Sequence, residues 1–361
     1  MMKLEPRKEI SKSLLYVTPV MAIILTILAG ILMFIFLGKP PLQAIYIIFV
    51  EPLTDSFLIA EMIVKATPLI LIAIGLSFGF KAGVWNIGAE GQFTIGALSG
   101  GATALLFYQV EGFWVLPLMC IAGALGGMAW AAIPAFLRTR FNANEILVSL
   151  MLTYVAVLLL SVLVHGPLRD PEGMNFPESR AFSESATVPN LIEGTRAHIG
   201  FLVALAAVGI AWVVLSRHVI GYQIKVMGQS PRAARFGGFS EKKVVWICLM
   251  ISGGLAGLAG LFEAAGPVGQ LVPSLPVGYG FTAIIVAFLG RLNPVGILLA
   301  GFVMALTYIG GEGAQIALNL PSAVTGVFQG MFLFFLLGID VLAKYRIRFT
   351  TRQSHSKGGL S

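Results

Sequence analysis

Long apolar runs recur along almost the whole 361-residue chain, and they constrain its fold more than any other feature of the sequence. A helix crosses a bilayer core with about 20 mostly apolar residues, whereas a membrane strand needs only about ten, in alternating polarity. The runs here are continuous, so they predict helices. We place ten spans, two of them short for a straight crossing, at residues 15–37, 57–80, 91–108, 115–137, 146–164, 199–215, 244–265, 279–290, 294–310 and 324–342.

The amino-acid composition agrees with a membrane protein and excludes the ordinary soluble classes. Only 11% of the residues are charged and 57% are hydrophobic, whereas soluble domains carry about 25% charged residues. So little polar surface cannot cover a water-soluble core of this size, which excludes a soluble enzyme, a nucleic-acid-binding protein and a disordered chain. The two cysteines lie in apolar runs and the four histidines are dispersed, so no metal site is expected. We therefore expect an all-α, polytopic transmembrane helix bundle.

Lysine and arginine are distributed unequally between the two sides of these spans. With the N-terminus in the cytoplasm, 19 of the 24 basic residues fall on the inner side. Lys39, Arg169, Arg180 and Arg196 fall outside, and Lys65 lies near a span. An inner excess of Lys and Arg sets the orientation of membrane proteins. We therefore expect both termini in the cytoplasm, and the net charge of +7 then reflects the inner membrane face.

The same topology predicts the organisation of the chain. We expect a cytoplasmic N-terminal tail at residues 1–14, a transmembrane domain at 15–342 and a basic cytoplasmic tail at 343–361. Two connections are long. Residues 165–198 form an acidic external loop, and residues 216–243 form a basic cytoplasmic loop.

The segment from Gly83 to Gln92, with the sequence GVWNIGAEGQ, interrupts two apolar runs. Non-helical backbone at membrane depth is tolerated where it lines a water-filled cavity, and Gly-interrupted helices mark the binding regions of transporters. Glu90 is an ionisable residue in an apolar neighbourhood, which makes it a functional candidate. The alternative is a short cytoplasmic turn in which Glu90 lies near the positive end of the next helix. The sequence leaves both interpretations open.

A second interruption, at residues 289–296, contains Asn293 followed by Pro294, and proline suits the first turn of a helix. The segments 78–100 and 279–301 each combine an apolar run, a Gly-rich interruption containing Asn and a Gly-rich helix. With ten spans, spans two to five and seven to ten would run in opposite senses. The two segments are therefore candidates for an inverted repeat with discontinuous helices.

The basic cytoplasmic loop contains the signals of a short helix. Ser230 is a favourable N-cap, Pro231 suits the first helical position, and Gly237 or Gly238 supplies the stop. These residues predict a helix over 231–236. We interpret this capped, basic helix between two spans as a docking element for a cytoplasmic partner.

This loop and the Gly-rich run that follows it, SGGLAGLAG at residues 252–260, resemble the permease subunits of ribose-type ATP-binding-cassette importers. The motifs at 83–92 and at 278–284, GYGFTAI, are similar to the larger of the two paired permeases of bacterial nucleoside (simple-sugar-like) uptake systems. The similarity covers roughly residues 66–342. It implies a bacterial inner-membrane importer with a second, paralogous permease, two cytoplasmic ATPase subunits and an external substrate-binding lipoprotein.

The resemblance also implies roles for individual residues. In that family the short helix fits a groove on the ATPase and transmits its closure, and the matching residues here are Gly228, Ser230, Pro231, Arg232, Ala233, Ala234, Arg235 and Gly237. The expected substrate pathway contains Trp85, Asn86, Glu90, Gln92 and Asn293. An aromatic face and amide groups suit a nucleoside, and they suit a sugar nearly as well.

The chain lacks the Gly-x-x-x-x-Gly-Lys-Ser/Thr phosphate loop and any recognisable catalytic set. We therefore expect a transport subunit that is not itself an enzyme, binds no cofactor and depends on ATP hydrolysis by its partner. Two alternatives stay open. One is a secondary transporter driven by an ion gradient, with Glu90 as its proton or sodium site. The other is an importer permease for branched-chain amino acids, whose zwitterionic substrate needs a charge partner or exposed half-helix ends.

Overall fold

The computed structural model describes residues 2–6 and 12–349, so residues 1, 7–11 and 350–361 of the two expected tails lie outside the described residues. Each of the ten apolar runs coincides with a helix, as predicted. These helices are α1 (Lys12–Phe36), α3 (Ser56–Ala82), α4 (Ala89–Leu106), α5 (Val115–Phe141), α6 (Glu145–His165), α7 (Gly200–Arg217), α10 (Glu241–Glu263), α11 (Tyr279–Leu289), α12 (Pro294–Leu318) and α13 (Ala323–Lys344). Shorter elements lie between them: α2 (Pro41–Phe49), η1 (Glu51–Leu53), η2 (Glu184–Ala186), α8 (Val219–Gln229), α9 (Pro231–Phe236) and the π-helical turn η3 (Ala264–Val268).

Within the described part of the chain, six helices are long and apolar enough to cross a membrane. They are α3, α5, α6, α7, α12, and α10 extended by η3. Four shorter apolar helices lie at Val20–Phe36, Pro41–Leu53, Tyr279–Leu289 and Ala323–Ile339. The protein is therefore a mostly helical, polytopic membrane protein, and the count of ten spans stays a prediction.

The structure departs from the all-α expectation near the two ends of the chain. Strands β1 (Met2–Pro6) and β2 (Tyr345–Phe349) pair antiparallel, with Met2 opposite Phe349 and Pro6 opposite Tyr345. The sequence of β2, YRIRF, alternates apolar or aromatic residues with arginine, which is the period of a strand. The search for apolar runs missed this ribbon because it registers continuous hydrophobicity and not alternation.

The chain forms two compact units. The first contains the two ends of the chain, up to Ile45 and from Pro321. In it α1 packs on α13, and the rings of Phe34 and Phe328 lie 5.6 Å apart. Gly30 makes this packing close, because a Cβ atom there would lie 2.3 Å from the Phe328 ring.

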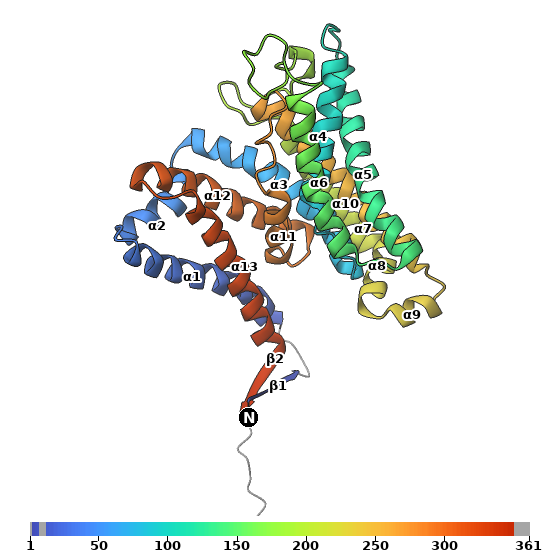
Figure 1. Ribbon diagram of the computed structural model, residues 1–361. Helices are drawn as coiled ribbons and strands as arrows, with labels where there is room; N and C mark the ends of the chain where they lie inside the picture. The colour runs from blue at the N-terminus through green and yellow to red at the C-terminus, as the bar shows by residue number, and fades with distance from the viewer. Residues whose placement is uncertain (1, 7–11, 350–361) are drawn as a thin grey trace, which may run out of the picture. The chain divides into compact units, whose positions relative to one another are not determined.

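The second unit, Tyr46–Leu320, is built around α10, which packs against α3, α4 and α5 (Figure 1). Glycines set the distances between these helices. A Cβ atom on Gly257 would lie 2.2 Å from the carbonyl oxygen of Gly123, and one on Gly96 would lie 2.1 Å from the Gly257 Cα. Small residues therefore let these helix backbones approach closely.

The long connection between α6 and α7 folds back onto the chain just after α10. The backbone N–H of Ser179 donates to the carbonyl of Leu271 at 3.0 Å, and that of Val188 donates to Ala265 at 2.9 Å. We call this end of the second unit the loop end. The opposite end of α10, where α8 and α9 precede it, is called the α9 end.

Candidate functional site

The break between α3 and α4 lies inside the second unit. Helix α3 ends at Gly83 in the left-handed conformation (φ 74°), and the N–H of Val84 donates back to the carbonyl of Gly79 at 2.9 Å. The chain then returns alongside α3 until Asn86 reaches Ser252, whose backbone packs on Gly75. Gly75 is seven residues before the end of α3, so the chain climbs back by about 10 Å at 1.5 Å per residue. Helix α4 therefore begins within the bundle.

The amide groups of the break bond to one another. Asn86 Nδ2 donates to Gln92 Oε1 and to Ser252 Oγ, both at 2.8 Å, and Gln92 Nε2 donates to Asn86 Oδ1 at 3.1 Å. The N–H of Gly88 also donates to Asn86 Oδ1. Both amides are buried. The sequence placed Asn86 and Gln92 in one site, and the structure brings them together as a closed network with α10.

Glu90 joins the starts of two helices that are far apart in the sequence. Its carboxylate accepts hydrogen bonds from the N–H of Gly278 at 2.7 Å and from the N–H of Gly280 at 2.5 Å. Glu90 is buried, and a Cβ atom on Gly280 would lie 2.2 Å from the Glu90 nitrogen. The carboxylate thus occupies the positive end of α11, where a negative charge is stabilised. The residue caps a helix, but that helix is α11 and not its own.

Trp85 lies in an aromatic cluster at the other end of α11. Its ring centroid is 5.0 Å from that of Phe80 and 5.9 Å from that of Phe288. Trp85 remains 39% exposed, so one face of the cluster stays open. Asn293 is exposed instead, and it caps α12 through a 3.0 Å hydrogen bond from the N–H of Val295.

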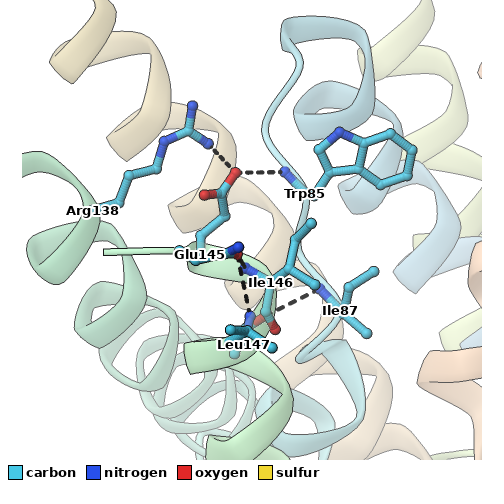
Figure 2. A network of polar contacts seen from close by, with 8 residues as sticks. Trp85, Ile87, Arg138, Glu145, Ile146 and Leu147 are labelled. Carbon is cyan, nitrogen blue, oxygen red and sulfur yellow. Dashed lines mark hydrogen bonds and ion pairs between the residues drawn. The ribbon is translucent and has the colours of Figure 1, made fainter. Parts of the chain in front are cut away.

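The turn between α5 and α6 contacts the break, and Figure 2 shows the hydrogen bonds that join them. Glu145 Oε1 accepts a short hydrogen bond from the Arg138 guanidinium and a longer one, 3.4 Å, from the backbone N–H of Trp85. Ser149 Oγ accepts from the N–H of Ile87 at 3.2 Å. The backbone of the break is therefore fixed to the first turn of α6.

Helix α9 spans Pro231–Phe236, and the prediction of a helix at 231–236 is confirmed. Ser230 caps it by accepting from the N–H of Ala233 at 3.3 Å. Ala234 is buried, whereas Arg232, Ala233 and Phe236 are exposed, Phe236 to 96%. Exposed Gly228 at the end of α8 packs on α3, and exposed Gly237 ends α9.

A cavity of about 590 Å³ lies beside α9. Arg235 donates to Glu241 at 2.8 Å on one side of it, and Arg138 and Asn142 line it from the end of α5. The wall of this cavity thus includes the first residues of α10 and the end of α5, whose Arg138 also pairs with Glu145.

Sequence reasoning missed the partners that complete this site. Ser252, Glu145 and the N–H groups of Gly278 and Gly280 carry no signal in the apolar pattern. Glu90 gave a signal because it is an ionisable residue in an apolar neighbourhood. The motifs at 252–260 and 278–284 contain Ser252, Gly278 and Gly280 but do not indicate which groups these residues contact.

Comparison with known proteins supplies the wider context. Residues 58–337 match the family described as "Branched-chain amino acid transport system / permease component". The chain is 37% identical to the glucose ABC transporter permease protein TsgB13 of Haloferax volcanii, over 96% of this chain and 93% of that protein.

Two guanosine ABC transporter permease proteins of Bacillus subtilis are also similar. NupP is 29% identical over 94% of this chain and 97% of its own length. NupQ is 29% identical over 71% of this chain and 83% of its own length. The similarity therefore extends further along the chain for NupP than for NupQ.

Proposed function

The chain belongs to the family of branched-chain amino acid transport system permease components, and on that premise we propose that it carries a nucleoside or a simple sugar across the membrane as the permease subunit of an ATP-binding-cassette importer. The observation that carries this proposal is the near full-length similarity to permeases named for glucose and guanosine. These names favour a neutral, hydroxylated substrate over the amino acids in the family description. They also disfavour a secondary transporter that works alone.

We assign the orientation from the distribution of basic residues. The α9 end faces the cytoplasm and the loop end faces outward, in the inner membrane of a bacterium. An external lipoprotein would then deliver substrate to the loop end. The similarity to both NupP and NupQ supports a paralogous second permease as the partner in the membrane.

The ATPase docks on α9 in this proposal. The surface formed by Arg232, Ala233 and Phe236 is exposed, and the Ser230 cap and buried Ala234 keep the helix in place. Aromatic residues and arginine are enriched at protein interfaces, and Phe236 is 96% exposed beside exposed Arg232. Four further residues would shape this surface without contacting the ATPase in the same way: Gly228, Pro231, Arg235 and Gly237. ATP is bound and hydrolysed by the partner, and this chain contributes no catalytic group.

The contacts that connect α9 with the break support alternating access as the mechanism in this proposal. Arg235 ties α9 to the first turn of α10, and Arg138 and Glu145 tie the end of α5 to Trp85. Glu90 then joins the start of α4 to the start of α11. Closure of the ATPase would move α9, and these contacts would transmit the displacement to the break.

The open face of Trp85 is the first surface that we assign to the substrate, because an exposed indole stacks on a nucleobase or a sugar ring. Asn86 and Gln92 would contact substrate only after their mutual hydrogen bonds open. Asn293 would line the pathway only from its exposed position at the start of α12.

Purification of the chain from its native membrane in mild detergent tests the proposal. The expected partners are an ATPase subunit, a second permease and a lipoprotein whose ligand names the substrate. A chain that purifies alone, and that supports uptake driven by a proton or sodium gradient in liposomes, would refute the importer assignment.

Arg232→Glu tests the docking surface. We expect the variant to insert and fold but to lose the ATPase on purification, because the charge of an exposed contact is reversed. Arg217→Glu is the matched control, since Arg217 is also exposed but ends α7. Equal recovery of the ATPase with both variants would exclude α9 as the docking site.

A further inference from the structure

A group of polar side chains at the loop end takes no part in the site described above. It consists of Lys65 on α3, Glu263 at the end of α10 and Tyr279 at the start of α11. The Tyr279 hydroxyl donates to Glu263 Oε1 at 3.3 Å, and the Lys65 ammonium lies 5.8 Å from the centroid of the Tyr279 ring. The Glu263 carboxylate and the Lys65 ammonium therefore both lie beside Tyr279. We call these three residues the loop-end cluster.

Glu263 retains an acceptor that the described residues do not use. Its side chain is only 7% exposed, and its Oε2 atom has no hydrogen-bond partner among them. A buried carboxylate oxygen is normally bonded, because burial without a partner costs free energy. The residue stands where α10 gives way to the π-helical turn η3, and such turns are frequent at functional sites.

The other charged groups at this end, Lys65 of the cluster included, are paired, which distinguishes Glu263 from them. Arg196 of the 165–198 loop holds Glu61 with two hydrogen bonds, at 3.0 and 2.5 Å. Lys65 forms an ion pair with Glu312 at 3.6 Å. Arg196 and Glu312 are more than half exposed, whereas Glu263 and Tyr279 are buried. Each of these ion pairs thus has one exposed partner, whereas the Glu263 acceptor is buried and has no hydrogen-bond partner among the described residues.

We propose that the loop-end cluster binds the hydroxyl groups of a neutral, hydroxylated ring, with Glu263 Oε2 accepting from the substrate and Lys65 Nζ donating to it. A hydroxyl both donates and accepts hydrogen bonds. A carboxylate acceptor and an ammonium donor beside the same tyrosine ring therefore match two neighbouring hydroxyls. The inference rests on the proposed function and deepens it. It places the recognition of the ribose or sugar ring at the loop end, apart from the aromatic face of Trp85.

The test uses the complete transporter in liposomes, with saturating substrate-loaded binding protein outside and ATP inside. The maximal uptake rates of uridine and 2′,3′-dideoxyuridine are compared, and their ratio reports selectivity after the substrate is handed over. A site built to bond a hydroxyl discriminates strongly against an analogue that lacks it. We expect a ratio of about ten or more for the unaltered protein. For a sugar carrier, glucose and 2-deoxyglucose replace this pair.

Glu263→Gln should reduce this ratio to about two, because the amide accepts less strongly and presents a donor to the substrate hydroxyl. Glu111→Gln makes the same chemical change at an exposed position in the α4–α5 connection and should leave the ratio unchanged. Basal ATP hydrolysis reports assembly. Where Glu263→Gln does not assemble, Lys65→Met removes the donor, and the ratio should again fall.

An undiminished ratio in the assembled variants would overturn the inference and leave the importer assignment intact. Failure of the unaltered complex to carry either substrate pair with ATP would instead refute the proposed function. The two failures are therefore distinguishable in one experiment.

Discussion

Replacement of Glu90 tests whether a buried carboxylate holds the start of α11 against the start of α4. Glu90→Ala removes both acceptors from the N–H groups of Gly278 and Gly280. Glu90→Gln keeps one amide oxygen and turns the other acceptor into a donor. Water cannot readily replace the lost bonds, because Glu90 is buried.

The expected cost follows from these contacts. A hydrogen bond to a charged group contributes about 1.5–3 kcal/mol, and two of them are lost in Glu90→Ala, so we expect a destabilisation of about 4 kcal/mol. Glu90→Gln should cost about half of that. With an unfolding entropy of about 2 cal/mol/K per residue, 4 kcal/mol lowers the Tm of a unit the size of Tyr46–Leu320 by about 7 °C.

The assay is thermal unfolding of the purified protein in detergent, with uptake measured on the same variants in liposomes. Exposed Glu193 provides the control substitution Glu193→Ala, whose Tm should stay within 1–2 °C of the unaltered protein by the small effect usual at surfaces. We expect the uptake rate to be highest in the unaltered protein, lower in Glu90→Gln and lowest in Glu90→Ala. A Tm and an uptake rate for Glu90→Ala that match those of the control would refute the clamp.

Three further predictions concern other contacts. Gly257→Ala should destabilise the protein by about 3 kcal/mol or more in denaturant unfolding, because the added Cβ would lie 2.2 Å from a backbone carbonyl oxygen of α5. Gly209→Ala should be neutral, because in the described part of the chain its added Cβ would meet no neighbouring atom within 4 Å. Burial lowers the pKa of His198 to about 4, below its unfolded value of about 6.5. Stability that depends on neutral His198 is therefore complete above pH 6.5 and declines toward pH 4, and the Tm of His198→Gln should decline less across that range. Glu145→Ala should reduce uptake per ATP hydrolysed by on the order of tenfold through loss of the contacts to Trp85 and Arg138, and an unchanged ratio would exclude this turn from coupling.

Local chemistry made the helices predictable. Continuous apolar runs specify helices because a membrane leaves the backbone no other partner for its hydrogen bonds. Ser230 followed by Pro231 specified the start of α9, because one supplies an acceptor and the other needs no N–H partner. Pro294 likewise occupies the first turn of α12. The paired strands near the chain ends escaped this reasoning, because it sought continuous apolar runs and not the alternation that β2 shows.

The site shows where local chemistry is insufficient. Glu90 stood out in the sequence as an acid in an apolar neighbourhood, yet its role depends on Gly278 and Gly280, 188 and 190 residues away. Asn86 was expected in the pathway, but its amide is engaged by Gln92 and Ser252.

The sequence by itself determined which segments are helical, where they are interrupted and which acids are unusual, because these properties follow from the period and polarity of neighbouring residues. Only the tertiary structure decided that α4 and α11 begin against each other and that Glu263 keeps a free acceptor beside Lys65 and Tyr279. The physical reason is the packing register. Glycine contacts such as Gly96 with Gly257 fix how far one helix slides along another, and that offset selects which polar groups meet.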